Sequence, residues 1–358
     1  MIPKHTENQR LPHMTIGRRR LGPGCPAYVV AEAGVNHDGS VEKALSLVDA
    51  ARQAGADAVK FQMFRAVELA SSGAETAQYQ KHFRGKSQRE LLAELELSHD
   101  EFRRVSQHCR ERGIEFLATP FGVGDVERLL ELDVNAIKLA STDLNNLPLL
   151  RRVAETGLPL ILSTGAAMAD EIHKCVERLA TLNVAERTVL LHCVSAYPAP
   201  LDAANLRAVA TLRFTFGTHS GFSDHTTDER TGGWAVALGA RVVEKHLTLD
   251  RAAPGPDHAM SLAPDQLARY IANIRDVERA LGSGVLGMDP IEADVRAVAR
   301  KSLVAAHDLA AGSELTSDSL CIKRPGGGVP PDQLDEVLGR RVAVDVGQDT
   351  VITWDMLQ

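Results

Sequence analysis

The sequence predicts an α/β protein, a (β/α)8 TIM barrel followed by a small β-rich domain, and three observations lead to this fold class. Short β-rich segments alternate with amphipathic helical segments from residue 27 to about 282, a pattern typical of a parallel sheet covered by helices. The β-rich segments number eight, which favours a closed barrel over an open doubly wound sheet. After residue 282 come short apolar runs broken by glycine and proline, which indicate a separate compact module.

The expected elements follow from the periodicity of apolar residues. Helical segments carry apolar side chains near the 3.6-residue period, whereas buried parallel strands are almost continuously apolar. Helices are expected at 41–54, 100–112, 124–132 and 168–182. Strands are expected at 27–34, 56–64, 114–121, 136–141, 158–165, 188–195, 219–226 and 241–249.

The 358 residues suit a barrel of ~250 residues with a small additional domain. We predict an N-terminal arm over 1–24, the barrel over 25–282, a linker over 283–299 and the small domain over 300–358. The arm is polar and basic without the apolar segment of a secretory signal, so it is expected to be loose. Because so short a C-terminal module buries only a thin core, we expect it to lean on the barrel or on a second subunit.

Composition argues against several classes of protein. The chain has 44% hydrophobic and 24% charged residues, as in soluble globular proteins, and it lacks an apolar run long enough to span a membrane. A formal charge of −7 without a basic stripe argues against nucleic-acid binding. Five widely spaced cysteines favour reduced thiols and a cytoplasmic location. Neither a P-loop nor a Rossmann fingerprint is present, which argues against nucleotide chemistry.

Polar side chains recur where the predicted strands end. In a barrel the carboxyl ends of all strands meet at one mouth, so residues far apart in the sequence converge there. Buried lysine or glutamate is costly unless it is paired, so this repeated placement indicates a functional site. The residues are Glu32, Lys60, Gln62, Lys138, Ser141, Ser163, Ser223, His225, Glu244 and His246.

Two histidines are the candidate metal ligands. His225 and His246 lie near the ends of the last two predicted strands, which are neighbours in a barrel. Two neutral imidazoles with water and substrate oxygens suit Mn²⁺ best, with Mg²⁺ or Co²⁺ as alternatives. Glu32 is a candidate further ligand or substrate anchor. The alternative is that both histidines are structural, which is the commoner role of a single buried histidine.

The lysines and serines at the mouth form a candidate anion site. Lys60 and Lys138 supply positive charge, and the hydroxyls of Ser141, Ser163 and Ser223 supply directional hydrogen bonds for a phosphate or carboxylate. The alternative is that the lysines snorkel at strand ends and the serines cap turns. Asp257, in the loop PGPDH, is either a ligand for sugar hydroxyls or a turn former, and Cys193 is interpreted as barrel packing.

Beyond single residues, the chain contains the ordered motifs AEAGVNHDGS, GADAVKFQMF, ATPF, LILSTGA, GFSDHT, EKHLTLD and GPDH, and its tail contains KSLVAA…KRPGGGVPP. These motifs resemble those of a known family, the sialic acid synthases, which make N-acetylneuraminate, legionaminate or pseudaminate. The tail resembles the antifreeze-like (SAF) domain of that family. The resemblance covers residues 25–358. It implies a domain-swapped homodimer that condenses phosphoenolpyruvate with N-acetylmannosamine or a diacetamido-dideoxy hexose. The products are a nine-carbon sugar acid and phosphate, released by C–O cleavage.

The resemblance also assigns roles to residues. His225 and His246 hold the metal, and Glu32 and Asp143 join them in the catalytic group. Phosphoenolpyruvate is bound by Lys60, Lys138, Ser141, Ser163, Ser195 and Ser223. The sugar is bound by Glu32, Gln62, Tyr197, Glu244, Asp257 and, from the second copy in the swapped dimer, Arg324.

Some positions depart from the family pattern. Thr142 stands where the family has glycine, which narrows the site or shifts Asp143, and Ser195 stands where some members have asparagine. SAYPAP resembles the pseudaminate branch, whereas PGPDH resembles the neuraminate and legionaminate branches, so the acceptor and its phosphorylation stay open. Two other functions are a metal-dependent barrel aldolase or sugar isomerase that does not use phosphoenolpyruvate, and a non-catalytic protein that binds sugar or ice.

Overall fold

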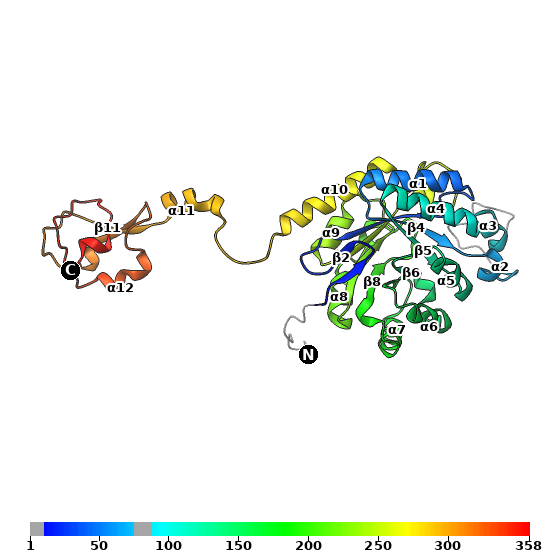
Figure 1. Cartoon of the computed structure of the whole chain (residues 1–358). Helices are drawn as coiled ribbons and strands as arrows, with labels where there is room; N and C mark the ends of the chain where they lie inside the picture. The colour runs from blue at the N-terminus through cyan, green and yellow to red at the C-terminus, as the bar shows by residue number, and fades with distance from the viewer. Residues whose placement is uncertain (1–10, 75–86) are drawn as a thin grey trace. The chain divides into compact units, whose positions relative to one another are not determined.

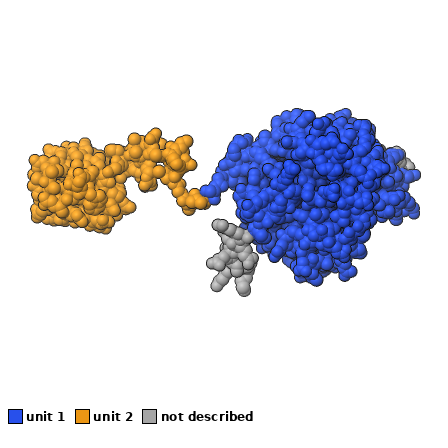
Figure 2. Space-filling model, viewed as in Figure 1, with its two compact units in different colours: residues 1–283 blue, residues 284–358 orange. Residues whose placement is uncertain are grey.

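The structure, a computed structural model, describes residues 11–74 and 87–358. The chain divides into two compact units, residues 1–283 and 284–358 (Figure 2). The first unit contains the parallel sheet and its helices, and the second contains a small module with its own core.

Eight strands of the first unit form one sheet, and every recorded pairing between neighbours is parallel. Their order is β5-β4-β3-β10-β9-β8-β7-β6. Because the edge strands β5 and β6 contact each other, the sheet nearly closes on itself (Figure 1), and the predicted barrel is confirmed. Each strand lies within a predicted segment: β3 (Tyr28–Gly34), β4 (Ala58–Met63), β5 (Glu115–Pro120), β6 (Ile137–Leu139), β7 (Leu160–Ser163), β8 (Thr188–Cys193), β9 (His219–Asp224) and β10 (Val242–His246).

Helices alternate with the strands and cover the barrel (Figure 1). Their ends follow local chemistry: Ser40 caps α1, and Gly55 ends it in the left-handed conformation that favours glycine. Among the residues of the described ranges, no helix has both the length and the apolar character of a membrane span. The helices of this unit are α1 (Val41–Ala54), α2 (Ala66–Leu69), α3 (Gln88–Glu94), α4 (His99–Arg112), α5 (Val123–Leu130), α6 (Leu147–Glu155), α7 (Ala169–Thr181), α8 (Arg207–Phe216), α9 (Thr231–Ala237) and α10 (Pro264–Leu281).

The period-two alternation of the strands separates two apolar layers. Val29 and Ala31 of β3 belong to the layer between sheet and helices, whereas Tyr28 and Val30 belong to the core inside the barrel. Continuing this alternation, Glu32 points inward at the carboxyl end of the strand. The barrel interior is therefore apolar near the amino ends of the strands and polar at the mouth.

The N-terminal segment differs from the prediction. Strands β1 (Met14–Ile16) and β2 (Arg19–Leu21) form an antiparallel hairpin whose Ile16 and Leu21 are buried in the core inside the barrel. The expectation of a loose arm is therefore wrong for residues 14–21, because three apolar side chains spaced along a basic stretch suffice to anchor it. Residues 1–10 of the predicted arm lie outside the described residues.

The second unit begins within the predicted linker. Residues 283–299 are not simply extended: they include a 3₁₀ turn (Pro290–Glu292) and helix α11 (Ala293–Ala299). The module that follows pairs β11 (Ser302–Ala305) with β12 (Leu320–Lys323) antiparallel and adds the short helix α12 (Leu334–Val337). Its core is built from buried aliphatic side chains such as Leu303, Val329, Val342 and Ile352.

Candidate active site

A cavity of about 450 Å³ opens at the carboxyl ends of the barrel strands. Every strand from β3 to β10 contributes at least one lining residue, because parallel strands bring their carboxyl ends to the same mouth. The predicted site residues that line it are Glu32, Lys60, Gln62, Lys138, Ser141, Asp143, Ser163, Tyr197, Ser223, His225, Glu244, His246 and Asp257.

Lys60 lies in the cavity wall between two carboxylates. Its Nζ is 2.8 Å from Oε2 of Glu32 and 3.7 Å from Oε2 of Glu244, and it donates to Oγ1 of Thr119 at 3.1 Å. Burial acts to lower the pKa of Lys60, but the charges of Glu244 and Glu32 outweigh it and the pKa is raised. The ammonium group is therefore charged. Thr119 was missed by sequence reasoning, although it lies in the quoted motif ATPF.

Lys138 provides a second buried amino group in the lining of the cavity. Its Nζ donates to Oγ of Ser163 at 2.8 Å and to the carbonyl of Leu139 at 3.0 Å, and it lies 3.9 Å from Oε1 of Glu244. Burial lowers its pKa, against the opposing charge of Glu244. Ser223 donates to the same Oε1 of Glu244 at 3.0 Å.

The pKa values of the two cavity glutamates are shifted in opposite directions. Burial acts to raise the pKa of Glu244, but Lys138 and Lys60 outweigh it, so the pKa lies below its ordinary value. Burial also raises the pKa of Glu32, and there the opposing charge of Lys60 does not overcome it. Lys60 and Lys138 both lie close to the ionised carboxylate of Glu244. Their N–H groups can also donate to an anion that enters the cavity.

His225 and His246 lie side by side, with ring centroids 5.5 Å apart. Nδ1 of His225 lies 2.6 Å from the carbonyl of Val194 and therefore carries the proton, which leaves Nε2 with its lone pair. Among residues 11–74 and 87–358, Nδ1 of His246 finds no hydrogen-bond partner; it is buried 3.8 Å from Oδ2 of Asp257. Burial lowers the pKa of both histidines, that of His246 well below its ordinary value, so both rings are neutral.

This donor set fits a divalent cation. A buried imidazole nitrogen without a partner beside a second neutral imidazole is what a metal ligand pair requires. Across the part of the chain that the structure describes, no group of three or more His, Cys, Asp or Glu side chains is placed to enclose an ion. Two histidines would therefore leave the remaining positions to water and substrate oxygens. Glu32, a candidate third ligand, is engaged with Lys60 instead.

Gln62, Tyr197 and Asp257 add further polar groups to the lining of the cavity. Gln62 donates from Nε2 to Oε1 of Glu32 at 3.3 Å, and the ring of Tyr197 lies 4.5 Å from that of His225. Burial, together with the charge of Glu32, raises the pKa of Asp257 to about 7. One wall is apolar and was missed by sequence reasoning: it comprises Val35, Leu69, Leu91, Leu92, Leu95 and Phe121.

Asp143 lies in a 3₁₀ turn after β6 (Ser141–Asp143). It accepts a hydrogen bond from Nδ2 of Asn146 at 2.8 Å and one from the hydroxyl of Thr142 at 3.4 Å. Burial raises its pKa. The threonine that departs from the family pattern thus contacts the carboxylate directly and itself lines the cavity.

Two predicted site residues are not brought to the cavity. Ser195 follows β8 and is exposed, and Arg324 belongs to the second unit. Their assigned roles stay predictions. Cys193, interpreted as packing, is buried and also lines the cavity.

Comparisons with known proteins match both parts of the chain, the barrel and the small second unit. The model of the NeuB family matches residues 47–286, and that of the SAF domain matches residues 300–358. The chain is 36% identical to the N,N'-diacetyllegionaminic acid synthase of Legionella pneumophila, over 96% of this chain and 98% of the relative. It is 35% identical to the N-acetylneuraminate-9-phosphate synthase of Homo sapiens, over 95% of each.

A solved structure is also similar along most of its length. It is the N-acetylneuraminic acid (sialic acid) synthetase of Leptospira borgpetersenii in complex with citrate, with a TM-score of 0.72 and 33% sequence identity. The match covers 81% of this chain and 96% of that one. Since both family models match in the expected order, the chain belongs to the NeuB family and carries a SAF domain after its barrel.

Proposed function

We propose that this protein condenses phosphoenolpyruvate with the open-chain aldehyde of an N-acylated amino sugar, forming a nine-carbon sialic-acid-type sugar acid and phosphate. The observation that carries the proposal is the position of two buried lysines beside two neutral histidines in one barrel mouth. Relatives at 36% and 35% identity are named as synthases of this kind.

Phosphoenolpyruvate binds, in this proposal, among the lysines and hydroxyls of the barrel wall. Lys60 and Lys138 offer charge to phosphate and carboxylate oxygens, and Ser163 and Ser223 turn their hydroxyls from Lys138 and Glu244 to the ligand. Ser141 and the exposed Ser195 complete the predicted donors. Binding of phosphoenolpyruvate adds negative charge beside the carboxylate of Glu244. The ammonium groups of Lys60 and Lys138 must offset this charge.

A divalent ion, best suited as Mn²⁺, would be held by His225 and His246. Bound there, it would supply Lewis-acid polarisation of the acceptor aldehyde. The hydrogen bond from Nδ1 of His225 to Val194 fixes the ring tautomer and orientation, as partners of metal-ligating histidines do.

The bond changes balance with water as the one additional reactant. C3 of phosphoenolpyruvate forms the new C–C bond to the aldehyde carbon, and the aldehyde oxygen takes up a proton to become a hydroxyl group. Water then adds to C2, and phosphate departs by cleavage of the C2–O bond, which leaves the keto group. Asp143 is the candidate base for water, because burial raises its pKa toward the range in which proton transfer is efficient.

The acceptor sugar is held by Gln62, Tyr197, Asp257 and, from a second copy of the chain, Arg324. The proposal includes a domain-swapped homodimer, in which Arg324 of one copy completes the site of the other. We also propose a cytoplasmic location, which agrees with five free thiols among the described residues.

The test is a phosphate-release assay on the metal-free protein. It uses N-acetylmannosamine, its 6-phosphate and a 2,4-diacetamido-2,4,6-trideoxy hexose, each with and without phosphoenolpyruvate and with Mn²⁺ or chelator. We expect phosphate release only when an acceptor, phosphoenolpyruvate and Mn²⁺ are all present. In the arms without phosphoenolpyruvate, consumption of the sugar is followed by chromatography. Conversion of a sugar there would favour the aldolase or isomerase, and the absence of turnover with every acceptor would favour a binding protein.

A further inference from the structure

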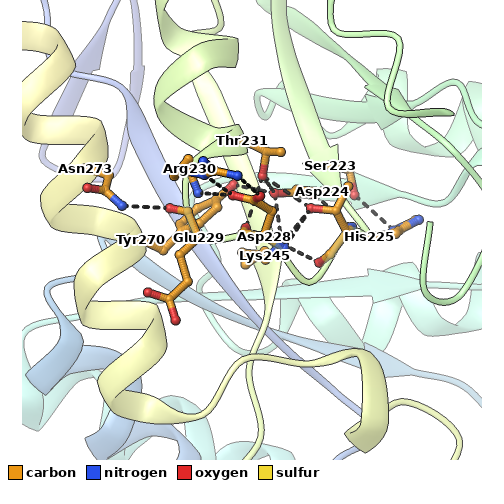
Figure 3. A network of polar contacts seen from close by, with 11 residues as sticks. Ser223, Asp224, His225, Asp228, Glu229, Arg230, Thr231, Lys245, Tyr270 and Asn273 are labelled. Atoms are coloured by element: carbon orange, nitrogen blue, oxygen red, sulfur yellow. Dashed lines mark hydrogen bonds and ion pairs between the residues drawn. The ribbon is translucent and has the colours of Figure 1, made fainter. Parts of the chain in front are cut away.

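A buried charged network lies on the outer side of the two strands that carry the histidines (Figure 3). Side chains alternate along β9 and β10, so Ser223 and Glu244 line the cavity while Asp224 and Lys245 point away from it. Asp224 and Lys245 are register partners in the parallel pair. His225 and His246 each follow one of them directly.

Both charges of this pair are completely buried. Nζ of Lys245 lies 2.9 Å from Oδ2 of Asp224, and both side chains are 0% exposed. The same Oδ2 accepts hydrogen bonds from the hydroxyls of Thr231 at 2.5 Å and Tyr270 at 3.0 Å. Helices α9 and α10 thus both donate to this carboxylate, which anchors strand β9 to the helices behind it.

The network also holds the turn that follows His225. Oδ1 of Asp224 accepts from the backbone N–H of Thr226 at 2.9 Å, and Lys245 donates to the carbonyl of Thr226 at 2.5 Å. Lys245, which precedes His246, therefore binds Thr226, which follows His225. In addition, the carbonyl of His225 accepts from the N–H of Ala199 at 2.9 Å. The backbone position of one histidine is tied directly to the strand of the other.

Stability alone does not account for a buried lysine at this place. A buried ion pair contributes no more to stability than well-packed apolar residues of similar volume, because desolvation offsets the attraction. Lys245 and Asp224 face the apolar layer outside the sheet, where neighbouring strand positions are filled by Val243 and Phe222. What the charged pair adds over a hydrophobic pair is directional bonds to a defined backbone position.

We propose that Asp224 and Lys245, together with Thr231 and Tyr270, are positioning residues that set the placement of His225 relative to His246. The inference rests on the proposed function, in which these two imidazoles hold the metal. None of these four residues lines the cavity. It acts through the turn at Thr226 and through the register of the two strands.

The test measures Mn²⁺ binding to the metal-free full chain, by the electron paramagnetic resonance signal of free Mn²⁺ and without substrates. Lys245→Met keeps the side-chain length and removes the donor, and we expect Mn²⁺ affinity to fall about 10- to 100-fold, as for other residues that orient metal ligands. Tyr270→Phe removes one hydroxyl and keeps the packing, and we expect a loss of about fivefold. Thermal unfolding is recorded for each metal-free variant.

Asp125→Asn is the matched control, because Asp125 is a buried carboxylate that pairs with Arg128 on α5 and does not line the cavity. It is expected to lower the melting temperature and leave Mn²⁺ affinity unchanged. Should Lys245→Met not fold, Tyr270→Phe decides the question. Equal affinities in wild type and both variants would overturn the positioning role alone, whereas a wild-type protein that binds no Mn²⁺ would reject the metal site and the positioning role together.

Discussion

The ring centroids of His225 and His246 lie 5.5 Å apart at the ends of two paired strands, and the residues that precede them, Asp224 and Lys245, are register partners. Adjacent positions on parallel strands thus deliver two imidazoles to one side of the mouth. Both rings are neutral because burial lowers their pKa. This pairing makes a shared cation the central hypothesis for the site.

His246→Ala should abolish metal-dependent turnover and leave the barrel folded. Its loss removes one of two imidazoles, and we expect the rate to fall on the order of 10²-fold or more. Phosphate release with saturating Mn²⁺ checks the loss of turnover, and circular dichroism checks that the barrel stays folded. His192→Ala is the control, because His192 is a partly buried histidine of β8 that bonds the carbonyl of Ala204 and does not line the cavity. Full activity in His246→Ala would remove the metal assignment.

Lys138→Met should weaken phosphoenolpyruvate binding more than acceptor binding. The substitution keeps the length of the side chain and deletes the ammonium group that now contacts Ser163. Loss of a charge-assisted contact to an anion predicts a rise in KM for phosphoenolpyruvate of about tenfold or more. Initial rates measured against each substrate separate the two constants. Lys174→Met, which changes an exposed lysine of α7, should alter neither, and equal increases in both KM values would contradict the assignment.

Most of the barrel and of its polar mouth was predictable from local pattern. All eight strands fall within segments chosen from their apolar character, and the strand-end residues from Glu32 to His246 line one cavity. The reason is geometric, since a parallel barrel collects strand ends whatever their distance in sequence.

What the sequence did not reveal depends on tertiary contacts. The hairpin at residues 14–21 is fixed by burial inside the barrel rather than by its own propensity. Thr119 became visible only through its contact with Lys60. Lys245 and Asp224 are in the quoted motifs, but a linear sequence does not show that they face each other behind the sheet.

His37 predicts a specific loss of stability in acid. It is fully buried, its Nδ1 accepts from the N–H of Gly39, and burial lowers its pKa from 6.5 to about 4. Between these values the unfolded chain binds more protons than the folded one, so stability present above pH 6.5 is lost as the pH falls toward 4. His37 contributes roughly 3 kcal/mol to this loss of unfolding free energy.

Urea unfolding of wild type and His37→Gln at pH 7.5, 6.0 and 4.5 checks this share. The other buried histidines act in the same direction, so the difference between wild type and variant is the quantity to follow. The variant should lose less unfolding free energy on acidification than the wild type. His307→Gln alters an exposed histidine of the second unit and should follow the wild type. Parallel curves for His37→Gln and wild type would show that His37 does not titrate in this range.

Arg324→Ala should raise the KM of the acceptor sugar and leave that of phosphoenolpyruvate unchanged, if the guanidinium completes the site of a second copy. Losing a charged hydrogen-bonding group predicts an increase of about tenfold. Lys323→Ala is the control, since that neighbouring cation pairs with Asp349 within its own unit. An unchanged acceptor KM would count against any role of Arg324 in the site.

Mixing two defective chains tests whether Arg324 acts across the dimer. In a swapped dimer, a chain with Arg324→Ala keeps its own His246 and receives an intact Arg324 from a partner that carries His246→Ala. Random co-assembly of equal amounts should then restore about a quarter of wild-type sites, since half of the dimers are mixed and each has one complete site. The assay is run at an acceptor concentration below the KM of Arg324→Ala, where that variant alone has little activity. If Arg324 instead serves its own chain, every site in the mixture lacks one residue, and co-assembly adds nothing to the summed activities of the separate variants.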